Sequence, residues 1–204
     1  MVTRLKRLVG RASGGGEHPF TVFVVQHAEA RNGDAQLGLS ARGREQAEAF
    51  ASSMKRGDVD IFVTGPVQAS IDTAETMRSA IGGELIVLEE FGESGADEEN
   101  GSMPGQGPGG VHDRGGFDGN AADRFLRGLD ILRARYAQPH RVMLVSDGER
   151  TLNAVRSIRS DEQIEVEAPG SFEQGIPACA MTTFVWRDGA WDVEVIAALT
   201  IPDI

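Results

Sequence analysis

The stretch FTVFVVQHAEA, residues 20–30, decides the fold, because an apolar run of strand length ends at a single histidine. A near-continuous apolar run predicts a strand that is buried on both faces. His27 comes directly after this run, where the chain leaves the strand and enters a loop. In parallel sheets, ligands bind beyond the carboxyl ends of the strands, so we expect any functional site to lie at this edge.

Strand-like and helix-like segments alternate through most of the chain after His27. Such alternation predicts βαβ units, and therefore an α/β three-layer sandwich: a mostly parallel sheet with helices on both faces. Ser40 is the expected N-cap of the first helix, and Pro66 is expected near the first turn of the second. A β-hairpin is expected around Asp188-Gly189. The expected strands are residues 20–26, 60–64, 84–88 and 141–146, and the expected helices are 39–54, 66–81, 121–137 and 148–158.

Composition excludes several classes of protein. A length of 204 residues suits one ordinary domain. The formal net charge of -11 argues against a general nucleic-acid binder, whose surface field is positive. No apolar stretch is long enough to span a membrane. Cys179 is the only cysteine, so it forms no internal disulfide, and we expect a buried, inert thiol and a reducing, cytoplasmic location.

Residues 1–16 differ from the rest, because they contain basic residues and no acidic ones. The basic residues are Arg4, Lys6, Arg7 and Arg11. Apolar residues share one helical face, which favours docking to a protein partner or a membrane surface. The same composition is typical of an organelle transit peptide (mitochondrial or plastid), and a solvated tail is the third interpretation. We therefore divide the chain into a basic segment with a glycine linker, residues 1–19, and one domain, residues 20–204.

Residues 92–120 form a long acidic and glycine-rich insertion without periodicity. A loop of this length in a compact domain is either functional or disordered, and it is a second candidate for contact with a protein partner. Its GQGPGG run is not a nucleotide fingerprint, because it follows no strand directly and contains no lysine. The histidines and Cys179 lack metal-ligand spacing. We expect no cofactor and no metal.

Four blocks of sequence, in this order, resemble the histidine phosphatase superfamily, also called phosphoglycerate mutase-like. QHAE at 26–29 corresponds to the family's Arg-His-Gly or Arg-His-Ala motif, and LSARGREQA at 39–47 to its next helix start. GPVQASIDTA at 65–74 and VSDG at 145–148 correspond to the later blocks. The first motif is closest to the branch that contains phosphohistidine phosphatases. The resemblance implies the phosphoglycerate mutase-like fold over about residues 20–198.

The resemblance also implies a site for phosphoryl transfer. In the family one histidine attacks phosphorus, two arginines and a second histidine bind the phosphoryl oxygens, and a carboxylic acid protonates the leaving oxygen. His27 keeps the position of the nucleophile. Gln26 and Ala69 occupy the two arginine positions, and Asp147 occupies the position of the second histidine. Glu90 is the candidate acid, although it can equally belong to the acidic loop.

The loss of these cations predicts a large loss of rate. One missing oxyanion donor costs about 10²–10³ in rate, and one arginine facing phosphoryl charge costs roughly 10³–10⁵. An ionised Asp147 would repel a phosphate dianion or hydrogen-bond the His27 imidazole instead. Three other cations could compensate by proximity in sequence: Arg31, Arg150 and Arg156.

These replacements favour a catalytically inactive or strongly impaired member of the family. We expect such a pseudophosphatase to act as a binding, regulatory or structural subunit, because a fold does not carry an activity once its site has been dismantled. The alternative is a phosphatase for phosphohistidine or a small phosphoester that works through a phospho-His27 intermediate.

Overall fold

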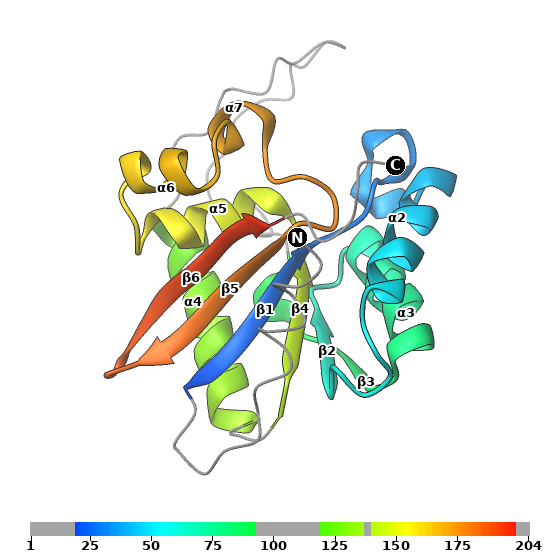
Figure 1. Ribbon diagram of the computed structural model, residues 1–204, viewed down its shortest axis with the longest axis horizontal. Helices are drawn as coiled ribbons and strands as arrows, with labels where there is room; N and C mark the ends of the chain where they lie inside the picture. The colour runs from blue at the N-terminus through cyan, green and yellow to red at the C-terminus, as the bar shows by residue number, and fades with distance from the viewer. Residues whose placement is uncertain (1–18, 93–118, 137–139, 199–204) are drawn as a thin grey trace, which may run out of the picture.

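The computed structural model describes residues 19–92, 119–136 and 140–198, which contain a six-stranded sheet in the order β3-β2-β4-β1-β5-β6 (Figure 1). The first four strands of this order run parallel, whereas β5 and β6 are antiparallel to their neighbours. The predicted α/β class with a mostly parallel sheet is therefore confirmed. The strands are β1 Phe20–Gln26, β2 Ile61–Thr64, β3 Glu84–Val87, β4 Val142–Ser146, β5 Met181–Arg187 and β6 Ala190–Ala198.

Helices cover both faces of the sheet, as the alternation of segments predicts. Among the described helices, none has the length and apolar character that a membrane span requires. The α-helices are α2 Ala41–Ser52, α3 Gln68–Ile81, α4 Gly119–Arg135, α5 Gly148–Arg156, α6 Asp161–Glu167 and α7 Ser171–Gln174. The 3-10 helices are η1 Arg31–Gly33, η2 Ala35–Leu37 and η3 Glu89–Phe91.

The alternation of side chains along β1 creates two apolar cores. Phe23 and Val25 belong to the core under α2 and α3, whereas Val22 and Val24 belong to the core under α4 and α5. All four side chains are at most 5% exposed, which explains why residues 22–25 are apolar at consecutive positions rather than at every second one.

The predicted strand of residues 20–26 is confirmed, whereas the second predicted helix begins later than expected. The helix was expected to start at residue 66, but α3 begins at Gln68, two residues after Pro66. The backbone of Val67, the N-cap residue, is still extended at φ -76° and ψ 125°. Pro66 therefore lies in the loop that joins β2 to α3.

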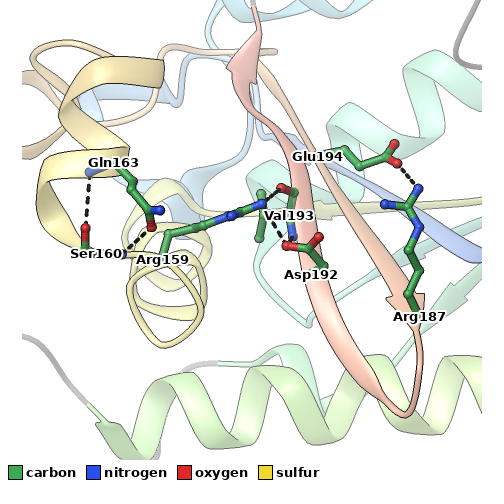
Figure 2. Close-up of polar contacts among 7 residues, drawn as sticks. All are labelled: Arg159, Ser160, Gln163, Arg187, Asp192, Val193 and Glu194. Atoms are coloured by element: carbon green, nitrogen blue, oxygen red, sulfur yellow. Dashed lines mark hydrogen bonds and ion pairs between the residues drawn. The ribbon is translucent and has the colours of Figure 1, made fainter.

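The C-terminal hairpin forms where Asp188-Gly189 predicts it. Both residues have positive φ, 51° and 85°, as a tight turn between two twisted strands requires. Arg187 forms an ion pair with Glu194 across the hairpin (Figure 2). Trp186 and Trp191, on either side of the turn, pack against each other with ring centroids 5.5 Å apart.

Arg159, in the turn between α5 and α6, connects this turn to β6. Arg159 Nη2 donates to the Val193 carbonyl at 2.7 Å and lies 2.8 Å from Asp192 Oδ1 (Figure 2). Helix α6 then begins with a capping box in which Ser160 and Gln163 satisfy each other's backbone N–H groups. Neither α6 nor α7 was expected from the sequence, although this Ser-x-x-Gln pattern is a signal for a helix start.

Candidate active site

The carboxyl ends of β1 and β4 bring His27 and Asp147 to the same edge of the sheet. Gln26 and Ser146 are paired in the parallel register of the two strands. The next residues are therefore neighbours in space, and His27 N donates to the Ser146 carbonyl at 2.9 Å. The edge predicted to hold the site thus collects residues from two separate sequence blocks.

The His27 ring is half-buried, and one short hydrogen bond fixes its orientation. Its Nδ1 atom lies 2.8 Å from the Ala28 carbonyl oxygen. A carbonyl oxygen only accepts, so Nδ1 must carry the hydrogen in this contact. In the neutral ring, Nε2 then keeps its lone pair and is the nitrogen available as a nucleophile.

The loop after His27 is held by residues of two other sequence blocks. Thr73 Oγ1 accepts a hydrogen bond from Ala28 N at 3.1 Å and itself donates to the Ala69 carbonyl at 2.6 Å. Gln46 Oε1 accepts from Glu29 N at 2.9 Å. Thr73 and Gln46 lie inside the motifs at 65–74 and 39–47, but the sequence does not indicate these roles.

Glu29 supports the start of α2. The predicted N-cap, Ser40, is confirmed, because its Oγ accepts from Gly43 N at 2.9 Å. The same hydroxyl donates to Glu29 Oε1 at 2.7 Å, and Arg42 lies 3.4 Å from Glu29 Oε2. Glu29 therefore links the loop after β1 to the start of α2.

Gln26 and Ala69 bring no charge to the site. The Gln26 Oε1 atom is buried and accepts no hydrogen bond from the described residues. A Cβ atom placed on Gly148 would lie 2.9 Å from Gln26 Oε1, so the amide rests against the first turn of α5. Ala69 is fully buried in the first turn of α3. Neither side chain can replace an arginine as a partner of phosphoryl oxygens.

Asp147 is the N-cap of α5, and its carboxylate faces that helix. Oδ1 accepts from Arg150 N at 2.9 Å, and Oδ2 lies 3.3 Å from Arg150 Nη1. The alternative in which the Asp147 carboxylate accepts a hydrogen bond from the His27 imidazole is not found among the contacts of the described residues. The free N–H groups at a helix start and a guanidinium cation are the stronger partners for a carboxylate, which explains the difference.

Arg150 joins this helix start to the segment after β3. Besides its contact with Asp147, Nη1 donates to the Phe91 carbonyl at 2.7 Å. The Phe91 carbonyl in turn lies so close to Gly65 that a Cβ atom there would collide with it. The guanidinium therefore lies at the carboxyl edge of the sheet, between the ends of β4 and β2.

The other two candidate cations lie elsewhere. Arg156 is at the far end of α5, where its Nε lies 3.1 Å from Asp161 Oδ1. Arg31 is exposed in η1. Of the three arginines that the sequence offers as replacements, the structure brings Arg150 into contact with Asp147.

Glu90 lies in η3, one residue before the carbonyl that accepts from Arg150. Its side chain is half-buried, whereas Glu89 is exposed. The position keeps Glu90 near the candidate site, and its role as an acid stays a prediction. The acidic part of the insertion, the basic segment at 1–16 and their predicted contacts with partners lie outside the described residues.

The Cys179 thiol is not a candidate for catalysis. Burial raises the pKa of the Cys179 thiol to about 12, so this cysteine stays protonated at neutral pH, in agreement with the predicted inert thiol. Within the described ranges, no cluster of three histidine, cysteine or acidic residues has the geometry of a metal site.

Comparison with known proteins agrees with this fold and with the order of the motifs. Residues 21–105 match the family model of the histidine phosphatase superfamily (branch 1). No curated protein matches the chain in sequence. Among solved structures, a mycobacterial glucosyl-3-phosphoglycerate phosphatase with bound VO3 is 18% identical with a TM-score of 0.61, covering 88% of this chain and 99% of that one.

Two further solved structures show the same similarity of fold. A phosphoserine phosphatase from Entamoeba histolytica is 17% identical with a TM-score of 0.59, covering 85% of this chain and 94% of that one. A putative phosphohistidine phosphatase from Agrobacterium tumefaciens is 16% identical with a TM-score of 0.53, covering 86% and 96%. The fold is therefore that of the solved histidine phosphatases, and residues 21–105 are similar in sequence to the histidine phosphatase superfamily.

Proposed function

We propose that this protein is a slow phosphatase that forms a phospho-His27 intermediate. The observation that carries the proposal is the hydrogen bond between His27 Nδ1 and the Ala28 carbonyl, because it leaves the Nε2 lone pair free. The similarity to solved phosphatases supports the same reaction class, whereas the sequence alone favours an inactive protein.

The reaction consists of two displacements at phosphorus. His27 Nε2 attacks the phosphorus atom, so a P–N bond forms while the bond to the leaving oxygen breaks. An acid, for which Glu90 is the candidate, gives its proton to that oxygen. Water then attacks the phosphohistidine, which releases inorganic phosphate and the free imidazole. The proposed substrates are protein phosphohistidine, whose leaving group is a nitrogen, or a small phosphoester.

The rate follows from the charges around His27. Gln26 and Ala69 supply no cation, so the transferring group meets less positive charge than two arginines would provide. One missing arginine can cost roughly 10³–10⁵ in rate, although such losses are not additive. We therefore expect turnover far below that of a site with both arginines.

Turnover of p-nitrophenyl phosphate by the purified full chain tests the proposal, with His27→Asn as the decisive variant. We expect slow turnover that is lost in His27→Asn and retained in the control His140→Asn, because His140 lies at the opposite end of β4. Absence of turnover in the native protein, or turnover that survives His27→Asn, would refute the proposal.

A non-catalytic binding role is the second candidate, and the neutral Gln26 and Ala69 positions favour it. Its proposed contacts are the basic residues of segment 1–16 or the acidic insertion. Deletion of residues 1–16 would then abolish capture of a protein partner from the native source without a change in phosphatase activity. Unchanged capture would remove this segment from the candidate surfaces.

The location in the cell is also a proposal, and the buried lone thiol of Cys179 supports a reducing compartment. We propose the cytoplasm, with an organelle as the alternative in which segment 1–16 acts as a transit peptide. Fluorescent fusions with and without residues 1–16 distinguish the two, because only the organelle alternative predicts that the deletion changes the location.

A further inference from the structure

The Arg150 guanidinium is anchored through one of its three nitrogen atoms. Nη1 contacts the Phe91 carbonyl at 2.7 Å and Asp147 Oδ2 at 3.3 Å. The other two nitrogens, Nε and Nη2, make no hydrogen bond with any residue that the structure describes. The side chain is 17% exposed, and neither of these nitrogens is a buried donor without a partner. They are therefore donors open to solvent.

The open edge of this guanidinium has the shape of an anion-binding fork. Nε and Nη2 carry parallel N–H groups on one edge of the planar cation, and such a pair matches two oxygens of a phosphate group. Because Nη1 is already held by two oxygens, the side chain has lost much of its freedom before an anion arrives. Binding then costs less conformational entropy than it would for a mobile arginine.

The position of this edge connects it to the candidate nucleophile. Arg150 lies in the first turn of α5, directly after the strand that is paired with β1. Its anchor, the Phe91 carbonyl, lies against Gly65 at the end of β2. The cation thus lies among the same strand ends from which His27 emerges, at an edge where Gln26 and Ala69 carry no charge.

We propose that Arg150 binds the phosphoryl group of the substrate through its Nε–Nη2 edge, with Phe91 and Asp147 holding Nη1. This inference rests on the proposed phosphatase function for the identity of the anion. An arginine three residues later thereby supplies the cation that the second-histidine position lacks, because that position holds Asp147. The Asp147 carboxylate is neutralised by the same arginine.

Binding of inorganic phosphate, measured by calorimetry in the His27→Asn background, tests Arg150 separately from turnover. Arg150→Met is compared with Arg156→Met, because both arginines lie on α5, form an ion pair with an aspartate and are 17% and 18% exposed. We expect Arg150→Met to weaken phosphate binding about 10- to 100-fold, the range for hydrogen bonds to charged groups. Arg156→Met is expected to bind within about twofold of its parent.

Arg150→Lys extends the test, since it keeps the charge and removes the fork. We expect several-fold weaker phosphate binding with an unchanged melting temperature, and this variant decides the question if Arg150→Met does not fold. The assignment would be overturned if Arg150→Lys bound phosphate as tightly as its parent. It would also be overturned if Arg156→Met weakened phosphate binding as much as Arg150→Met does. Arg150-dependent binding without turnover in the native protein would support the inference and refute the phosphatase function.

Discussion

His27 and Asp147 follow paired ends of neighbouring parallel strands, yet His27 binds the residue that follows it, and Asp147 binds the first turn of α5. His27 Nδ1 contacts the carbonyl of the next residue at 2.8 Å. The Asp147 carboxylate contacts the backbone N and the guanidinium of Arg150 at 2.9 and 3.3 Å. Among the residues that the structure describes, the second ring nitrogen of His27 has no hydrogen-bond partner, and the Asp147 carboxylate is held by a cation.

The replacement Asp147→Asn tests whether the carboxylate opposes anion binding. Asparagine caps a helix as well as aspartate does, so we expect a melting temperature close to that of the native protein. Loss of the negative charge should strengthen phosphate binding about tenfold, because Phe91 still anchors Arg150. Calorimetric titration with inorganic phosphate measures this change. Weaker binding would show that the charge of Asp147 serves the site.

The replacement Gln26→Arg tests whether missing positive charge limits the rate. The new guanidinium would enter the site beside the first turn of α5, and we expect kcat/KM for p-nitrophenyl phosphate to rise by about tenfold or more. Val166→Arg is the control, because it adds the same charge on an 81% exposed side chain of α6. A similar rise in both variants would attribute the gain to net charge instead of to the site.

The replacement Thr73→Val tests the support of the His27 loop. It keeps the shape of the side chain and removes the acceptor of the buried Ala28 N–H group, so we expect a loss of about 1–3 kcal/mol in the free energy of unfolding. Thr76→Val is the control, because its hydroxyl bonds the Asp72 carbonyl within the same helix without contact to the loop. Urea denaturation compares the two, and equal losses would contradict a special role for Thr73.

The pair of Asp60 and Arg141 predicts a dependence of stability on pH at the opposite edge of the sheet. Partial burial raises the pKa of Asp60, but hydrogen bonds and the charge of Arg141 outweigh it and lower the pKa below its usual value. The stabilisation is then complete above the unfolded-state pKa of about 3.9 and disappears as the pH falls through the lower folded-state value.

We therefore expect Asp60→Asn to be less stable than the native chain at pH 7 and equally stable once the pH lies below the folded-state pKa of Asp60. Urea denaturation midpoints at the two pH values measure the difference. If Asp60→Asn remained less stable than the native protein in acid, the loss of stability would come from packing and not from the charge of Asp60.

The fold was accessible from the sequence because the strands β1, β2 and β4 are buried on both faces. Residues 22–25 of β1 are apolar at consecutive positions, and the bounds of this strand match the prediction, whereas α6 buries only Ile164 and has no apolar stripe. The start of α3 could not be placed from Pro66, since the extended conformation of Val67 depends on how the loop after β2 packs.

The sequence motifs select candidate site residues, whose roles stay a prediction, but they do not indicate the partners that these residues contact. The order of the motifs indicates that positions 26 and 69 correspond to the family's two arginines and position 147 to its second histidine. The contact between Arg150 and the Phe91 carbonyl joins residues 59 positions apart, so no local sequence pattern predicts it. For the same reason the sequence predicts repulsion or an imidazole contact for Asp147 and misses its ion pair.

Trapping of the phosphorylated protein tests the central claim most directly. The full chain is mixed with p-nitrophenyl phosphate, quenched in alkali to preserve phosphohistidine, and digested for mass spectrometry of the peptide that contains His27. We predict phosphate on His27 in the native protein and none on this peptide in His27→Asn. A native peptide without phosphate, or phosphate attached to a different residue, would contradict the account.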